Sequence, residues 1–377
     1  MSGSPITRIA LDVVSPVPNT RWCFITVECA DGAVGIGEAT LQAQEAALLD
    51  LAKATLPGLI GSAADTAGIA RQKPADLPHA ALASALSHAF WDIAATRQGV
   101  PLCEALGPVA RREIPVYANF NRRTRNRTQE GFAASAGDAL AAGFDAFKLA
   151  PFDEVTPEAR KAGDEHTAMQ TGLARVAAVR ERIGPERALM VDCHWRFTPV
   201  GAAAALDALR PLGLHWFECP IPETDEMIPE IVRLRGQANA AGTLLAGCEH
   251  EIGVAGFERF VAAGAYDVVM PDIKYVGSID EMLALGRRLE GAGTVFSPHN
   301  PSGPVCHAAS LHVCAVAPEL ARLEMQFDET PVFPNLVGGA LPVPRGGVSA
   351  LPFGAGLGVK LDPAVRDEYR VVSLSFG

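Results

Sequence analysis

The stretch LMVDCHWRFTPVGAAAALDALRPLGLHWFECP, residues 189–220, indicates how the chain folds. An apolar run ends in Asp-Cys-His, an alanine-rich helical pattern follows, and a second apolar run ends in Glu-Cys-Pro. Short apolar runs separated by a helical segment are typical of two parallel strands joined by a helix. The stretch therefore predicts one β-α-β unit of a parallel sheet.

The same unit recurs on both sides of this stretch. We expect strands at residues 114–120, 146–151, 189–194, 216–220, 244–249, 268–274, 294–299 and 323–327. Helical patterns lie between several of them, at residues 130–143, 172–184, 200–212 and 278–293. Eight strands alternating with helices predict an α/β fold with a parallel (β/α) barrel, whose working face is formed by the carboxyl ends of the strands. A doubly wound sheet is the alternative, but we find no Gly-rich phosphate loop to support it.

The segments that flank the barrel have a different pattern. Residues 22–38 predict a hairpin with an Asp-Gly turn, and helical patterns follow at about residues 42–54 and 80–98. We expect three parts: an α+β domain at residues 1–112, the barrel at residues 113–330, and a Gly- and Pro-rich segment at residues 331–377 that returns to the first domain.

Composition excludes several classes of protein. The 377 residues include 32 Lys and Arg against 43 Asp and Glu, a net charge of −11, which argues against nucleic-acid binding. No apolar run approaches the roughly 18 residues of a membrane-spanning helix, and the first residues lack the pattern of a signal peptide. The eight cysteines form no CxxC pair, so we expect reduced thiols in a cytoplasmic protein.

Three successive strands of the predicted barrel end in a carboxylate: Asp192, Glu218 and Glu249. These side chains would converge at the mouth of the barrel, where burial and mutual repulsion would be costly without a cation. All-oxygen ligands favour Mg²⁺, with Mn²⁺ possible and Zn²⁺ less suitable. The alternative is that each acid caps a helix or lies in a solvated loop.

The next two strands end in Asp272 and His299. A carboxylate beside an imidazole fixes its tautomer and raises its basicity, which suits an acid or base that works near neutral pH. A structural loop histidine is the alternative.

These residues, together with Glu324 on the last strand, resemble a known family. VDCH, FECP, AGCE, MPD, SPH and LEMQ follow the order of the mandelate racemase subgroup of the enolase superfamily. Residues 27–39 and 84–102 resemble the signatures of its capping domain. The resemblance implies a (β/α)7β TIM-type barrel with an α+β capping domain completed by the C-terminal segment. It also implies Mg²⁺-assisted removal of the proton α to a carboxylate, an enediolate intermediate, Glu324 as a hydrogen-bonding partner of the substrate carboxylate, and an even-numbered homo-oligomer.

The residues at two positions help to distinguish the reactions that members of this subgroup catalyse. The subgroup often has Lys-x-Lys on the second strand, whereas this chain has Lys148-Leu149-Ala150 and lacks the second lysine. Lys148 can still point into the mouth and contact the substrate, or it is a structural lysine at the strand end. His194 shares the face of Asp192, and Asp-x-His resembles the sugar-acid dehydratases of the subgroup, where this histidine takes part in proton transfer.

We therefore predict dehydration of a sugar acid, aldonic or aldaric, to a 2-keto-3-deoxy acid. Elimination needs one base and one acid, which His299 and His194 can supply, whereas racemisation needs groups on both faces of the carbanion. A lactone cycloisomerase, racemase or epimerase is the enzymatic alternative. A non-catalytic binding barrel is disfavoured, because it would be expected to lose one of the five strand-end groups.

Further contacts with the substrate are predicted near the first strand end and in the capping domain. Tyr117, Asn119, Asn121 and Arg122 are candidates for hydroxyl or carboxylate contacts, and His250 is assigned to the loop. Residues 16–21 and 40–45 are the capping loops expected to select the substrate.

Overall fold

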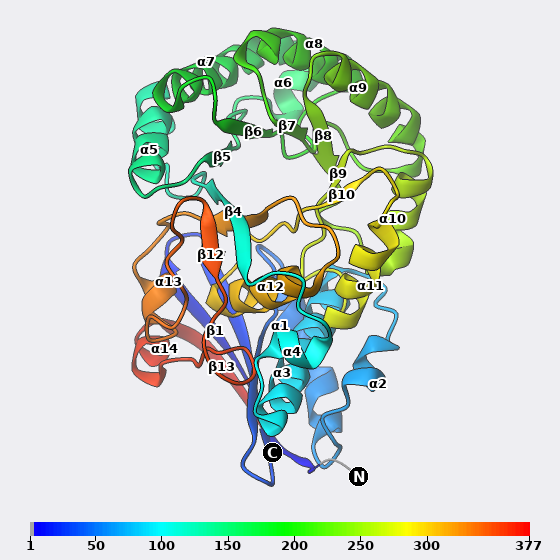
Figure 1. The fold of residues 1–377 in the computed structure, drawn as a ribbon, viewed down its shortest axis with the longest axis vertical. Coiled ribbons are helices and arrows are strands. Elements are labelled where there is room, and N and C mark those ends of the chain that lie inside the picture. Colours follow the sequence, from blue (N-terminus) through cyan, green and yellow to red (C-terminus); the bar gives the residue numbers. More distant parts are fainter. Residues whose placement is uncertain (1–3) are drawn as a thin grey trace.

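A four-stranded antiparallel sheet forms one part of the computed structural model, which describes residues 4–377 (Figure 1). Its order is β13-β1-β2-β3, with bounds β1 Ile6–Val17, β2 Thr20–Cys29, β3 Val34–Glu38 and β13 Arg370–Phe376. The predicted hairpin is confirmed, and Gly32 in its turn has a φ of 83°. Strand β13 pairs with β1, Leu374 opposite Leu11, so the C-terminal segment completes this sheet as expected.

Helices pack against this sheet and complete the capping domain. Their bounds are α1 Glu45–Thr55, α2 Thr66–Ala70, α3 Leu77–Gln98 and α4 Leu102–Leu106. Helix α3 approaches β3 so closely that a Cβ built at Gly37 would lie 1.9 Å from the carbonyl oxygen of Ala85. Only glycine permits this close contact between α3 and β3.

Eight parallel strands curl into the barrel in the order β4 to β10, with β11 beside β4 (Figure 1). The bounds are β4 Glu113–Asn119, β5 Ala146–Leu149, β6 Ala188–Asp192, β7 Trp216–Glu218, β8 Leu244–Gly247, β9 Val268–Val269, β10 Val295–Phe296 and β11 Leu323–Gln326. The ends of the curled sheet meet where Ala321 N donates to Phe296 O at 2.9 Å and Glu324 N donates to Pro298 O at 3.2 Å. All eight predicted strands are present, each shorter than predicted at its carboxyl end.

Helices cover the outside of the barrel, as the amphipathic segments predict (Figure 1). Their bounds are α5 Gln129–Ala141, α6 Pro157–Ala162, α7 Glu165–Ile183, α8 Pro199–Leu209, α9 Ile228–Ala240, α10 Gly253–Ala262, α11 Ile279–Leu289 and α12 Pro304–Val316. Inside the barrel, Tyr117 and Trp216 pack edge to face at 5.4 Å within a layer of buried apolar side chains. This layer fills the interior below the carboxyl ends of the strands.

The C-terminal segment contacts both parts of the molecule. It contains α13 Val332–Asn335, β12 Val348–Ala350 and α14 Pro363–Tyr369 before β13. Strand β12 pairs antiparallel with β4 of the barrel, a contact that the sequence did not predict. The expected domain boundaries at residues 112 and 330 stay predictions. Among residues 4–377, no helix is long and apolar enough to cross a membrane.

Candidate active site

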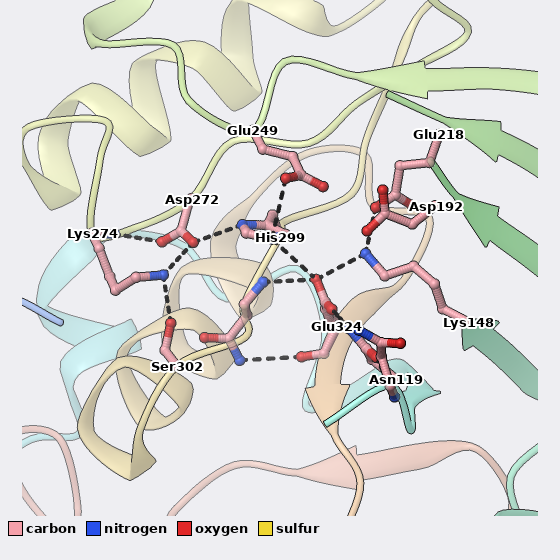
Figure 2. A network of polar contacts seen from close by, with 12 residues as sticks. Asn119, Lys148, Asp192, Glu218, Glu249, Asp272, Lys274, His299, Ser302 and Glu324 are labelled. Carbon is pink, nitrogen blue, oxygen red and sulfur yellow. Dashed lines mark hydrogen bonds and ion pairs between the residues drawn. The ribbon is translucent and has the colours of Figure 1, made fainter. Parts of the chain in front are cut away.

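Three carboxylates from neighbouring strands meet at the carboxyl end of the barrel (Figure 2). Asp192 and Glu218 are the last residues of β6 and β7 and lie side by side in the register, and Glu249 follows β8 by two residues. One oxygen of each lies within 4.8 Å of the others, and all three side chains are buried. The predicted convergence is confirmed, and this carboxylate triad could hold a metal ion.

The backbone turns sharply at these strand ends. Cys219 and Cys248 have φ values of 44° and 70°, in the left-handed region that residues other than glycine rarely adopt. The Cys248 N–H donates to the half-buried Glu223 carboxylate at 2.6 Å, and the Cys219 N–H donates to Ala246 O at 3.0 Å. These bonds hold the strained turns that direct Glu249 towards its two partners.

The negative charge of the three buried carboxylates would be neutralised by a bound cation. Burial, together with the charges of Asp192 and Glu218, raises the pKa of Glu249 well above its usual value. Within residues 4–377, Glu249 Oε1 is buried and has no hydrogen-bond partner. A carboxylate oxygen left in this state is costly, and a metal ion bound by oxygen ligands would satisfy it.

His299 lies beside Glu249 in the same mouth and is oriented by Asp272 (Figure 2). An isolated parallel bridge pairs the two residues, and His299 Nδ1 lies 2.8 Å from Asp272 Oδ2. Lys274 Nζ binds the same carboxylate and donates to Ser302 Oγ at 2.7 Å. Burial alone would raise the pKa of Asp272, but Lys274 and His299 lower it to about 2. The imidazole therefore keeps a charged partner at Nδ1, while its Nε2 lies 3.4 Å from Glu249 Oε2.

His194 lies beside Asp192, but it does not belong to the strand. The prediction that the strand continues to residue 194 is wrong: β6 ends at Asp192, and His194 and Trp195 have φ values of 48° and 55°. The His194 N–H donates to Asp192 Oδ1 at 2.9 Å, a local bond that takes the chain out of the strand. Nε2 of His194 lies 2.7 Å from Asp192 Oδ2, and this carboxylate raises the pKa of the imidazole.

Lys148 contacts carboxylates of the protein itself. Its Nζ lies 2.5 Å from Glu218 Oε1 and 3.3 Å from Glu324 Oε2, and its side chain is 1% exposed (Figure 2). Burial alone would lower the pKa of Lys148, but the two carboxylates raise it well above its usual value. Asn119 donates to the second oxygen of Glu324, so this buried acid is held from two sides.

A cavity of about 510 Å³ opens above these groups, a volume typical of small-molecule sites. The lining includes the predicted residues Asn119, Asn121, Arg122, Asp192, His194, Glu249 and His299, whereas Lys148, Glu218 and Glu324 lie outside it. Tyr117 lies in the apolar layer inside the barrel. His250, assigned to the loop by the sequence, lines the cavity and packs 4.7 Å from the Trp195 ring.

The capping domain closes one side of this cavity. Residues 40–44, which follow β3, line it, in agreement with the predicted role of the loop at 40–45. Residues 17–20 of the other predicted loop line an adjoining cavity instead. Lys274 also lines the active-site cavity and was missed, although its spacing in Asp272-Ile-Lys274 places both side chains on one side of an extended segment.

Two family models match the chain. Residues 7–107 match the model described as mandelate racemase / muconate lactonizing enzyme, N-terminal domain, and residues 131–365 match the model described as enolase C-terminal domain-like. The second match covers more than half of the chain.

Curated proteins and solved structures agree with these matches. The chain is 29% identical to a D-gluconate dehydratase of Thermoproteus tenax over 76% of its length, although it spans only 56% of that relative. It is 30% identical to a D-galactonate dehydratase of Xanthomonas campestris, over 82% of this chain and 78% of that protein. The crystal structure of a member of the enolase superfamily from Salmonella Typhimurium shares the fold, with a TM-score of 0.85 at 20% identity and coverage of 99% and 100%.

Proposed function

Because the chain belongs to the mandelate racemase / muconate lactonizing enzyme family of the enolase superfamily, we propose that it dehydrates a sugar acid to a 2-keto-3-deoxy acid. The relatives named for gluconate and galactonate support a sugar acid as the substrate class. The observation that carries the proposal is the meeting of the carboxylate triad and the His299–Asp272 pair in one buried mouth. These two groups would supply a cation site and, next to it, a proton-transfer site for one substrate.

The proposed ligands of the metal are Asp192, Glu218 and Glu249, and the proposed metal is Mg²⁺, with Mn²⁺ as the alternative. The fit rests on three oxygen donors and on Glu249 Oε1, which lacks any other partner within residues 4–377. When bound, such an ion supplies Lewis-acid stabilisation of the negative charge that develops on the substrate carboxylate.

Proton transfer is assigned to the two histidines. Asp272 accepts a hydrogen bond from Nδ1–H of His299, which leaves Nε2 to take or give a proton on the cavity side, near Glu249. His194 lies on the β6 side of the cavity and is the proposed partner for the leaving β-hydroxyl or for the α-proton. The configuration of the substrate at carbon 2 decides which histidine faces the α-proton.

Lys148, Glu324 and Asn119 form one hydrogen-bonded group next to the triad. We assign Lys148 and Glu324 to the end of the site that holds the substrate carboxylate, and Asn119 holds Glu324 in place. The position two residues after Lys148 is Ala150, and Lys148 itself is held by two carboxylates. The second strand therefore offers no free lysine base on the face opposite His299. This favours elimination over racemisation, which needs a base on each face, unless His194 takes the place of that lysine.

A screen of sugar acids tests this function. The protein is incubated with Mg²⁺ and a library of aldonates and aldarates, and 2-keto-3-deoxy acids are measured as semicarbazones. We expect at least one acid to be dehydrated, and we expect the product to disappear when EDTA replaces Mg²⁺. Exchange of the α-proton for deuterium in D₂O without loss of water would contradict a dehydratase and indicate a racemase or epimerase.

Two further predictions about the cellular state accompany this function. The eight cysteines are free and buried, which is compatible with the cytoplasmic location that we propose. The proposed even-numbered homo-oligomer is tested by light scattering during size-exclusion chromatography, where a monomer would contradict it.

A further inference from the structure

A second cavity, of about 370 Å³, adjoins the active-site cavity. It lies between residues 17–20 of the capping domain and the segment that follows β4. Gln42 and Arg122 line both cavities, so the two spaces meet at the side chain of Arg122. A substrate longer than the reacting carbons would extend towards this side chain.

The second cavity carries an excess of positive charge. Its charged lining residues are Arg122, Arg125 and Glu329. Arg122 Nη2 donates to the neutral Gln42 Oε1 at 3.1 Å, and its Nη1 lies 3.8 Å from Glu329 Oε2, too far for a hydrogen bond. Arg125 makes no ion pair within residues 4–377. Two guanidinium groups thus face one carboxylate.

The order of the strands places this positive group across the mouth from the triad. The triad lies on β6, β7 and β8, whereas Arg122 comes three residues after the end of β4, and β4 lies opposite β8 in the order of the eight strands. A sugar acid whose reacting carboxylate lies at the triad would direct its far carbon towards Arg122.

We propose that Arg122, supported by Arg125, binds a second anionic group at the far end of the substrate. The preferred substrates are then aldarates, which carry a carboxylate at each end, rather than aldonates, whose far end is a neutral hydroxyl. This inference rests on the proposed function and narrows its substrate class. A guanidinium group suits a carboxylate because its planar donors can bind both oxygens.

The test compares an aldarate with the aldonate of the same hydroxyl configuration. In the wild-type protein we expect kcat/KM to favour the aldarate by at least about tenfold, and Arg122→Met to lower that ratio by about 10- to 100-fold, since a charge-assisted pair is lost. Glu329→Gln removes the competing carboxylate and should raise the ratio. Arg123→Met is the matched control, because Arg123 pairs with Asp138 and Asp328 and lines neither cavity.

Binding measured by calorimetry separates this proposal from the proposed function. If neither acid is dehydrated, the dehydratase assignment fails, and tighter binding of the aldarate to wild type than to Arg122→Met still supports the anion subsite. If the aldonate is dehydrated at least as efficiently as the aldarate and binds as tightly, the subsite is refuted while the dehydratase stands. A preference for the 6-phosphoaldonate over the aldarate would overturn the assignment to aldarates.

Discussion

Replacing Glu249 by Gln should make the metal-free protein more stable and at the same time abolish its response to Mg²⁺. In EDTA, Glu249 lies within 4.8 Å of two other carboxylates, and a pair of charges at that distance repels by about 3.5 kcal/mol at an effective dielectric constant of about 20. Lys148 offsets the charge of Glu218, and His194 lies beside Asp192. Glu249 has no lysine or arginine partner within residues 4–377, and its contact with His299 Nε2 at 3.4 Å is an ion pair only when the imidazole is protonated. Neutralising Glu249 therefore mainly removes repulsion.

The protonation of Glu249 gives a second value for the destabilisation that its charge causes in the metal-free protein. The pKa of Glu249 is raised well above 4.5, so the folded metal-free protein can hold this carboxyl protonated. The stability that this gives is fully present below pH 4.5 and falls by about 1.4 kcal/mol per pH unit as pH rises towards the raised pKa. At pH 7.5 the cost is therefore at most about 4 kcal/mol. We expect Glu249→Gln to raise the free energy of unfolding in EDTA at pH 7.5 by about 2 to 4 kcal/mol.

In Mg²⁺ the wild-type protein should instead be more stable than Glu249→Gln. An ion that binds only the folded state stabilises it by about 2.7 kcal/mol at 100 times its Kd. Thermal unfolding is followed by calorimetry in EDTA and in excess Mg²⁺ for wild type, Glu249→Gln and the control Glu251→Gln. Glu251 is half-buried, with a pKa raised to about 7, but it pairs with Arg259 at 2.9 Å and lies outside the triad.

Two differences in Tm are expected together. Glu249→Gln should have the higher Tm in EDTA and the lower Tm in Mg²⁺, whereas Glu251→Gln should keep the wild-type shift on adding Mg²⁺. If Glu249→Gln lowers the Tm in EDTA and still gains as much from Mg²⁺ as the wild type, the triad is not the metal site.

Two other predictions concern histidines, one proposed for proton transfer and two that affect stability. His299→Asn should reduce kcat by at least about 10²-fold while Mg²⁺ and substrate still bind, as measured by calorimetry; activity close to wild type would remove His299 from proton transfer. His88 and His312 are buried, and burial lowers the pKa of each from 6.5 to about 4. The stability that each contributes is present above pH 6.5 and is lost as pH falls towards 4, by up to about 3 kcal/mol. Urea unfolding from pH 7.5 to 4.5 should lose less stability in His88→Gln than in wild type, and an equal loss would argue against this assignment; the exposed His79, changed to Gln, is the control.

The barrel and its triad could be predicted because both depend on local pattern. Asp192 and Glu218 end apolar runs, and parallel strands bring their carboxyl ends to one rim whatever the intervening helices do. Asp272 and His299 follow the same rule, even though β9 and β10 are only two residues long. The location of the site at the carboxyl ends of the strands can therefore be predicted from the sequence, without knowledge of any tertiary contact.

Other features of the site depend on contacts between distant residues. His194 approaches Asp192 through a turn with positive φ, which alternation along a strand cannot predict. Lys148 contacts Glu324, 176 residues further along the chain, only because the sheet curls. The loop at residues 40–44 follows Glu38, whose carboxylate accepts hydrogen bonds from the distant Gly303 N–H and Cys306 N–H of the barrel. The sequence pattern of a single segment cannot predict such contacts between distant residues.

The buried charges of the mouth also indicate where chemistry can occur. Lys148 neutralises Glu218, and Lys274 neutralises Asp272, so two of the buried carboxylates already have cations of the protein as partners. Glu249 has no lysine or arginine partner within residues 4–377 and lines the cavity that a substrate would enter. A buried carboxylate without a cation is unstable unless a ligand completes it. Lysines of the protein thus pair with Glu218 and Asp272, which do not line the cavity, whereas Asp192 and Glu249, which do, pair only with histidines within residues 4–377.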